Sequence, residues 1–383
     1  MNIIMNKNCI GNCLLCGKCK EYSILESFDD EPMKITPREG FGVAIDIGTT
    51  TVVLALCDLK NGAVIKRHSF YNPQREFGPD VISRIDAANR GGLFVLKNMI
   101  NKRIASGLKE LKKHCDGEIS EVVIAGNTVM THLLLGFSCQ SLGVFPFRPA
   151  RELLEEYWLF GLPATIVPWF TAFVGGDIMA GLLFRKKKES FLLVDLGTNG
   201  EMALYQEGKL LVTASAAGPA FEGAAGCGAG GGASFVITEL ANLVKKGSID
   251  ETGMITEDNI FTQKQVRDLQ LAKSAVRSGL EILLAAAGLS YSQVDKVYLA
   301  GGIGQAMDID DAVTIGLIPA KLAEKVIPAG NTSLGGAIRL LLAKEQGKKE
   351  IAELQALVNE INLAEHERFN DLFMENMFFG GYV

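Results

Sequence analysis

The sequence predicts an α/β protein made of two similar domains. Apolar strand-like runs alternate with helical segments from Gly42 onward, and apolar residues recur at helical spacing through residues 95–113. The second observation is an internal repeat, in which residues 43–50 (VAIDIGTT) match residues 192–199 (LLVDLGTN). The two copies lie about 150 residues apart, which is the size of one domain. A duplicated domain follows from that spacing.

Each copy of the repeat predicts a β-hairpin whose turn can bind phosphate. A strand ends in Asp, a Gly-Thr turn follows, and second strands cover residues 52–56 and 202–205. Gly48 and Gly197 lack the Cβ that would keep phosphate oxygens away from the backbone N–H groups. The predicted phosphate-binding residues are Gly48, Thr49 and Thr50 in the first turn and Gly197, Thr198, Asn199 and Gly200 in the second.

Asp46 and Asp195 end the first strands of the two hairpins. Two opposed turns direct both carboxylates to one site, where oxygen ligands suit a hydrated Mg²⁺ that bridges phosphates. One such motif is common turn chemistry, whereas the pair is specific. We predict catalytic roles for both residues.

A third segment, residues 297–304 (VYLAGGIG), is a buried-strand run that ends in glycines. Gly301, Gly302 and Gly304 are predicted to let a purine and its ribose approach the strand-to-helix turn. In this order along the chain, the three segments resemble the two phosphate motifs and the adenosine motif of the actin, hexokinase and heat-shock-chaperone ATPase superfamily. The resemblance implies duplicated actin-like ATPase (ribonuclease H-like) domains around a cleft that binds Mg-ATP.

Some polar residues allow more than one interpretation. Asp177, in a Gly-Gly-Asp turn, either positions the attacking water or the Mg²⁺ shell, or bonds its own backbone. Glu222 has apolar neighbours, which favours contact with the nucleotide. Asn127 and Thr128 are predicted to cap a helix, and His132, among leucines, to be a core residue.

Four cysteines near the start of the chain have metal-site spacing. Cys9, Cys13, Cys16 and Cys19 follow the pattern C-x3-C-x2-C-x2-C, which favours an iron-sulphur cluster of the 4Fe-4S type. Structural zinc is the second interpretation, and a free or disulfide-bonded cysteine patch the third. Whether one chain supplies all ligands, or a second chain in a homodimer contributes some, stays open.

Further segments narrow the resemblance to the ATP-dependent reductive activators of corrinoid proteins. They are residues 77–85, 126–128, 173–177, 217–223, 262–267, 331–334 and 362–364, and the resemblance runs from about Phe41 to about Phe379. It implies that an iron-sulphur module, fed by a low-potential electron donor, passes one electron to a Co(II) corrinoid protein while ATP binding and hydrolysis drive the transfer to Co(I). The chain departs from this family in its short cysteine segment and in residues 226–232, where a Cys-Gly-Met-Arg-like stretch is expected.

The composition of the chain limits which partners the protein can bind and in which compartment it is expected. A net charge of −6 argues against a nucleic-acid surface. Residues 161–184 carry a single charge, but Pro163, Pro168 and the glycines before Asp177 argue against a membrane span. Eight cysteines with no secretory signal indicate the cytoplasm.

The predicted organisation has four parts. Residues 1–40 form the cysteine segment and linker, 41–188 the first ATPase subdomain, 189–345 the second, and 346–383 a C-terminal helical segment. The nucleotide motifs alone also fit two competitors. One is an ATP-switched, chaperone-like binding protein with structural zinc, and the other is a small-molecule kinase.

Overall fold

The structure is a computed structural model. It describes residues 35–151, 156–185, 188–197, 199–206, 208–218, 220–223, 233–257 and 260–380. The cysteine cluster from Cys9 to Cys19 and the glycine-rich residues 226–232 lie outside the described residues. The account of the fold therefore concerns the two predicted ATPase subdomains and the C-terminal segment.

The first half is built on a six-stranded sheet in the order β3-β2-β1-β4-β6-β5. The strands β1, β2 and β3 pair antiparallel, and β4 and β6 continue the sheet parallel to β1. The strand bounds are β1 Phe41–Ile47, β2 Thr51–Asp58, β3 Val64–Tyr71, β4 Ile119–Gly126, β5 Glu156–Leu159 and β6 Leu162–Ile166.

The second half repeats five strands of this arrangement in a sheet ordered β11-β10-β7-β8-β9-β12, in which β12 lies at the opposite edge from the counterpart of β5. The strands β7, β8 and β9 form the antiparallel meander, and β10 and β11 run parallel to β7. Both predicted hairpins and the predicted duplication are thereby confirmed. The strand bounds are β7 Phe191–Leu196, β8 Gly200–Gln206, β9 Lys209–Ser215, β10 Lys296–Ala300, β11 Val326–Gly330 and β12 Val358–Glu360.

Helices cover both faces of each sheet. The helix predicted over residues 95–113 is α4, and its buried residues include Leu96, Ile100, Ile104, Leu108 and Leu111, as the helical spacing predicted. The main helices are α3 Val81–Ala87, α4 Leu93–Lys112, α5 Thr128–Leu135, α6 Gly176–Leu182, α7 Ala220–Gly223, α8 Ala233–Lys246, α9 Gln263–Ala287, α10 Gly301–Ala306, α11 Ile309–Thr314, α12 Thr332–Leu342, α13 Lys344–Leu357 and α14 Phe369–Glu375. Shorter turns are η1 Pro73–Phe77, η2 Ala88–Gly92, η3 Gln140–Leu142, η5 Tyr291–Gln293, η6 Ala320–Lys325 and η7 Leu363–Glu365.

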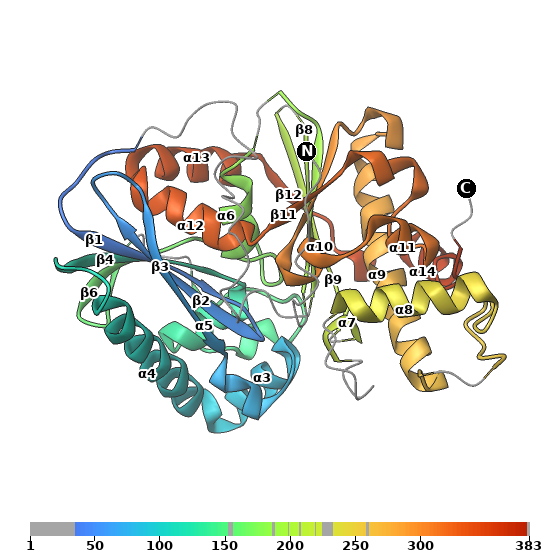
Figure 1. The fold of residues 1–383 in the computed structure, drawn as a ribbon, viewed down its shortest axis with the longest axis horizontal. Helices are drawn as coiled ribbons and strands as arrows, with labels where there is room; N and C mark the ends of the chain where they lie inside the picture. Colours follow the sequence, from blue (N-terminus) through green and yellow to red (C-terminus); the bar gives the residue numbers. More distant parts are fainter. Residues whose placement is uncertain are drawn as a thin grey trace.

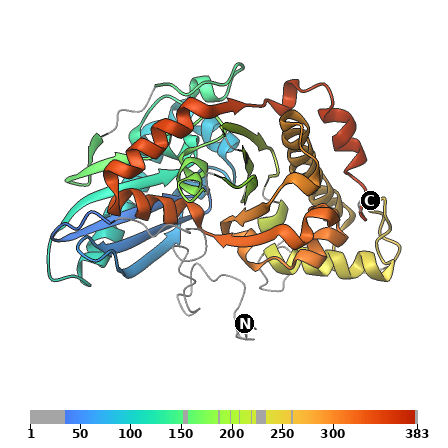
Figure 2. The ribbon, with the colours of Figure 1, turned by 90° about the horizontal axis from the view of Figure 1, so that it is seen from above.

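The two halves share one apolar layer. In Figure 1, α12 and α13, in orange and red, lie beside α6 and the blue strands of the first half, and Figure 2 shows the same arrangement from above. Side chains from both sheets, from α6 and from α12 form a single buried cluster there. The outer faces have separate cores, one with α3, α4 and α5, the other with α8, α9, α10 and α11. The helix α12 thus belongs to the core of both halves.

Strand alternation directs the two repeat carboxylates toward this shared layer. Side chains alternate between the two faces of a strand. In β1, Val43 and Ile45 belong to the outer core while Ala44 belongs to the shared one, so Asp46, two residues after Ala44, faces the shared layer. In β7 the same argument applies to Leu193 and Asp195. Both carboxylates therefore point into the space between the sheets.

The apolar stretch over residues 161–184 is not one helix. Strand β6 and helix α6 occupy separate parts of it, and residues 167–175 between them are non-helical. Among the residues that the structure describes, no helix has both the length and the apolarity that crossing a bilayer requires.

The end of the described chain packs along α9. Near the middle of that helix, Lys273 Nζ donates to the carbonyl oxygen of Phe378, and Ser274 Oγ donates to that of Phe373. Gln270 Nε2 donates to the carbonyl oxygen of Met377 at 2.8 Å. Buried polar groups need such partners, and here the backbone of α14 and of the residues after it supplies them.

Candidate functional site

Four acidic side chains meet between the two halves. Asp46 and Asp195 are the penultimate residues of β1 and β7. Asp177 is in the first turn of α6, and Glu201 is near the start of β8. Burial and the nearby carboxylates of Asp177 and Asp46 raise the pKa of Asp195 to about 8. The three predicted catalytic residues therefore come together, because charges affect each other's ionisation in this way only at short range.

A hydrogen bond joins the side chains of Asp177 and Glu201. Burial raises the pKa of Asp177 to about 6, and it raises the pKa of Glu201 well above its ordinary value. The hydrogen bond between the two side chains favours the charged form of Asp177 and the neutral form of Glu201. Glu201 is therefore the donor, and Asp177 carries the negative charge.

The local alternative predicted for Asp177 is confirmed, and its role toward water or the Mg²⁺ shell stays a prediction. Asp177 Oδ1 accepts the backbone N–H of Ile178 at 2.9 Å, which is the local bond expected of a turn residue. The same carboxylate belongs to the acidic group between the halves. Its position at the N-terminus of α6 also suits a negative charge.

The acidic group fits a hydrated cation better than a directly coordinated one. Among the described residues, no three Cys, His, Asp or Glu side chains converge closely enough to bind a metal by themselves. Mg²⁺ usually keeps several waters and takes one or two carboxylates together with substrate phosphates. The all-oxygen donor set agrees with that mode of binding.

The first turn is held by a backbone hydrogen bond of its own and by the side chains of Asn72 and Asn127. Gly48 N–H donates to the carbonyl oxygen of Thr51 at 3.0 Å, and a Cβ on Gly48 would come within 2.7 Å of that oxygen. Asn72 Nδ2 donates to the carbonyl oxygen of Gly48 at 2.9 Å. Asn127 Nδ2 donates to Thr49 Oγ1 at 3.1 Å. The Thr49 hydroxyl is thus an acceptor toward Asn127 and keeps its own proton for a second partner.

The second turn is tighter than the first. Gly197 N–H donates to the carbonyl oxygen of Asn199 at 3.1 Å. A Cβ on Gly200 would come within 2.5 Å of Ser215 Oγ, which itself donates to the Gly200 carbonyl oxygen. Thr198 and the side chain of Glu222 lie outside the described residues, so their predicted contacts stay predictions.

The glycines of the third segment form the junction between β10 and α10. Gly301 has φ +81°, and a Cβ there would come within 2.5 Å of Asp195 Oδ1. A Cβ on Gly304 would come within 3.0 Å of the backbone of Leu299, and Gly302 lies in the same first turn. The strand-to-helix turn is confirmed, and it lies directly against the second repeat carboxylate.

A narrow pocket separates the two halves at this point. Asn127 and Thr128 line it from the first half, Asn199 and Glu201 from the second, and its volume is about 10 Å³. That is about the space of one water molecule.

Two predictions about the first half are confirmed. Asn127 caps α5, because its Oδ1 accepts the backbone N–H of Met130 at 2.9 Å. His132 is fully buried, with Nδ1 bonded to the carbonyl oxygen of Thr128 and Nε2 accepting the N–H of Ala150.

Sequence reasoning missed several residues of the site. Glu201 lies opposite Asp195 in the second hairpin, where the first hairpin has the buried Val53 opposite Asp46, so a carboxylate at this position is a signal in the repeat itself. Asn331 and Ser333 donate hydrogen bonds to Asp46. In the sequence they are marked only by the similarity of residues 331–334 to the reductive activators. Asn72 carries no local signal of its role.

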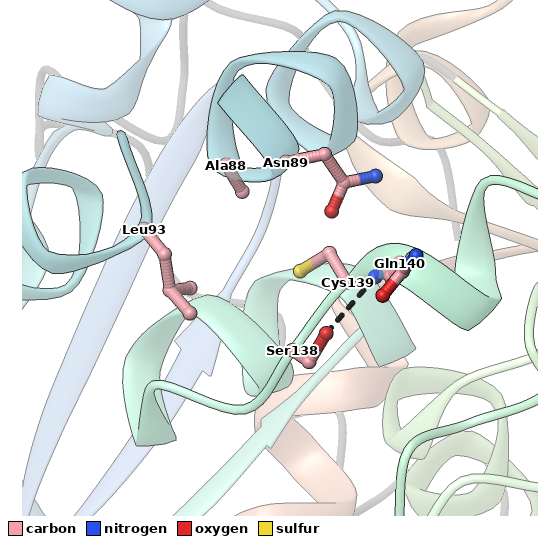
Figure 3. Close-up of a pocket in the computed structure, with 6 residues that line it drawn as sticks. All are labelled: Ala88, Asn89, Leu93, Ser138, Cys139 and Gln140. Atoms are coloured by element: carbon pink, nitrogen blue, oxygen red, sulfur yellow. Dashed lines mark hydrogen bonds between the residues drawn. The ribbon is translucent and has the colours of Figure 1, made fainter. Parts of the chain in front are cut away.

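A larger pocket of about 270 Å³ lies elsewhere on the first half. Figure 3 shows Asn89 and Leu93 on one side of it and the segment from Ser138 to Gln140 on the other. Burial raises the pKa of the Cys139 thiol to about 12. This thiol is therefore protonated at neutral pH.

Comparison with known proteins identifies the family. A family model described as the RACo middle region matches residues 41–189. A second, described as the C-terminal domain of RACo, the ASKHA domain, matches residues 189–240 and 238–382. This chain belongs to the RACo family. The ASKHA domain is the actin-like ATPase fold, in agreement with the duplicated strand order.

Named relatives of this RACo-family chain are similar over most of its length. It is 30% identical to the corrinoid activation enzyme RamQ of Eubacterium limosum, over 90% of this chain and 71% of RamQ. It is 23% identical to the [Co(II) methylated amine-specific corrinoid protein] reductase of Methanosarcina barkeri, over 87% of this chain and 76% of the reductase. A solved structure named reductive activator for corrinoid, iron-sulfur protein superposes with a TM-score of 0.79 at 31% identity. The superposition covers 89% of this chain and 66% of the chain of the solved structure.

Proposed function

We propose that this protein is an ATP-dependent reductive activator of a corrinoid protein. In this proposal it passes one electron to the Co(II) form and couples that uphill step to ATP hydrolysis. The observation that carries the proposal is the meeting of Asp46 and Asp195, one from each repeat, in a chain that RACo-family models match from residue 41 to 382. The names of the relatives supply the substrate class.

The nucleotide part of the mechanism follows from the site. The turns at residues 48–50 and 197–200 are assigned to the phosphates, through the Thr49 hydroxyl and through backbone N–H groups other than those of Gly48 and Gly197, which donate within the turns. Asp46 and Asp195 hold the water shell of Mg²⁺, which neutralises charge on the phosphates when it is bound. Asp177, kept charged by Glu201, orients the attacking water. Glu222 and the glycines at 301, 302 and 304 contact the nucleoside.

The electron part of the proposal rests on the cysteine segment. Cys9, Cys13, Cys16 and Cys19 are the proposed ligands of a 4Fe-4S cluster, which would supply a single electron at low potential. An uphill one-electron transfer loses a factor of ten in its equilibrium constant for about every 59 mV, so coupling to ATP is required. A low-potential protein donor is proposed to refill the cluster.

The remaining details are proposals as well. We assign residues 41–188 and 189–345 to the two ATPase subdomains and residues 346–383 to a C-terminal helical segment, with a homodimer as the assembly in which ligands could be shared. A cytoplasmic location agrees with the free thiols of Cys57, Cys115 and Cys139.

The test follows the visible spectrum of a Co(II) corrinoid protein with this chain, a chemical reductant and Mg-ATP under anaerobic conditions. We expect Co(I) to form only when ATP is present. Asp195→Asn should abolish the ATP effect and leave the cluster spectrum intact, because the substitution removes a carboxyl group from the proposed nucleotide site alone.

Cys16→Ala is the complementary variant. It should lose the cluster and Co(I) formation but retain ATP hydrolysis. Iron and acid-labile sulphide are expected in anaerobically purified protein, and zinc in their place would contradict the electron-transfer half. Unchanged Co(I) formation in both variants would show that the mechanism is wrong.

A further inference from the structure

The segment at the start of α12 reaches across the molecule to Asp46. Asn331 Nδ2 donates to Asp46 Oδ2 at 2.8 Å, and Ser333 Oγ donates to Asp46 Oδ1 at 2.7 Å. Asn331 and Asp46 are 285 residues apart in the sequence. Each oxygen of the carboxylate therefore has its own donor, and both donors come from a single helical turn.

The orientation of the Asn331 amide is fixed by a second bond. Its Oδ1 accepts the backbone N–H of Leu334 at 2.7 Å and so caps α12. With the oxygen held by the helix, the NH₂ group necessarily faces Asp46. A flipped amide would lose both bonds, because it would place its oxygen against the carboxylate.

These contacts oppose the effect of burial on Asp46. Burial alone favours the neutral acid, and it holds the pKa of Asp46 above its ordinary value. The bonds from Ser333 and Asn331 act in the opposite direction and favour the carboxylate. The N-terminus of α12 adds partial positive charge on the same side.

The support beneath this contact is rigid. Every residue of α12 is buried, between the two sheets. The helix crosses α6 so closely that a Cβ on Gly336 would come within 2.0 Å of the carbonyl oxygen of Ala180. Donors on such an element can hold a carboxylate in one orientation, because the helix itself has no room to shift.

We propose that Asn331 and Ser333 are positioning residues that hold the Asp46 carboxylate in the orientation in which it accepts the water shell of nucleotide-bound Mg²⁺. This inference rests on the proposed ATP function and assigns a role to a segment outside the nucleotide motifs. Loss of either donor should weaken only the Mg²⁺-dependent part of nucleotide binding. The reason is that each donor contacts Asp46 and neither is assigned a contact with the phosphates or the base.

The test measures the binding of a fluorescent ATP analogue to the purified full-length chain, once with excess EDTA and once across a Mg²⁺ titration. For Ser333→Ala we expect about a tenfold rise in the Mg²⁺ concentration that gives half-maximal tight binding, the effect of one charge-assisted hydrogen bond. Asn331→Asp, which retains a capping oxygen but replaces the donor by a second carboxylate, should show a larger rise. Binding in EDTA should stay at the wild-type level.

Thr332 supplies a matched control between the two donors. Its side chain is 2% exposed, and its hydroxyl has no hydrogen-bond partner within the described part of the chain. Thr332→Val should therefore leave the Mg²⁺ dependence of binding unchanged. Ser333→Thr keeps a hydroxyl, so its Mg²⁺ dependence should lie closer to the wild type than that of Ser333→Ala.

The outcomes separate this inference from the proposed function. Wild-type Mg²⁺ dependence in Ser333→Ala and Asn331→Asp, or equal losses with and without Mg²⁺, would overturn the positioning role alone. A wild-type chain that binds no nucleotide under either condition would overturn the positioning role and the proposed function together.

Discussion

Lys273 is a buried lysine whose ionisation should affect the stability of the fold. Burial, with a smaller contribution from the charge of Arg277, lowers its pKa to about 7. In the unfolded chain a lysine keeps its proton to about pH 10.4. Between pH 7 and pH 10 the unfolded chain therefore binds more protons at this position than the folded chain does. The contribution of Lys273 to the free energy of unfolding accordingly rises with pH across that window and is constant below it.

The corresponding prediction compares wild type with Lys273→Met by urea unfolding at pH 7 and pH 9. The free energy of unfolding should increase with pH by roughly 2 kcal/mol more in the wild type than in the variant. Lys264→Met is the control, because Lys264 lies on the exposed face of the same helix, with its side chain 87% exposed. If the free energy of unfolding depends on pH identically in wild type and Lys273→Met, Lys273 stays protonated in both the folded and the unfolded chain at these pH values, and the prediction is wrong.

At the scale of elements, the crossing of α6 and α12 is the tightest helix contact described above. A Cβ on Gly336 would meet the backbone of Ala180, which cannot rotate away as a side chain can. Gly336→Ala should force the helices apart and lower the free energy of unfolding by about 1–3 kcal/mol or more.

Gly347→Ala, in α13, is the matched control. The nearest atom there is the flexible end of the Leu340 side chain, so the change should have little effect on chemical or thermal unfolding. Equal stability of Gly336→Ala and wild type would show that the crossing can loosen without cost.

The local elements could be predicted from the sequence because their signals are local. The hairpin at β1 and β2 and the apolar stripe of α4 each depend on residues within a few turns or strands of one another. The contact between Asn331 and Asp46 has no such signal, because it joins residues at the two ends of the fold. The carboxyl group of Glu201 is visible in the sequence, but its role depends on Asp177, which belongs to another element.

At the scale of the whole molecule, the first half should not be stable by itself. Its inner sheet face, including Ala44, Val53 and Val123, is covered by α6 and by α12 from the far end of the chain. A fragment of residues 35–189 would expose much of this face to water, which costs about 25 cal/mol for each Å² of apolar surface. We expect the fragment to aggregate or to unfold without a cooperative transition.

A second fragment distinguishes this explanation from a general intolerance of truncation. Residues 331–357 fused after residue 189 through a flexible linker should restore a cooperative urea transition, because they supply the missing layer. Cooperative unfolding of the 35–189 fragment alone, measured by circular dichroism, would contradict the prediction.

The shared helix also sets an order of events during synthesis. Domains generally fold as units while the chain emerges from the ribosome, beginning with the N-terminal one. Here the strands of the first half are complete by Ile166, yet their last covering helix ends at Leu342. One sheet face of the nascent first half is therefore incompletely covered until residue 342 has been translated. That interval is when this chain most needs a chaperone.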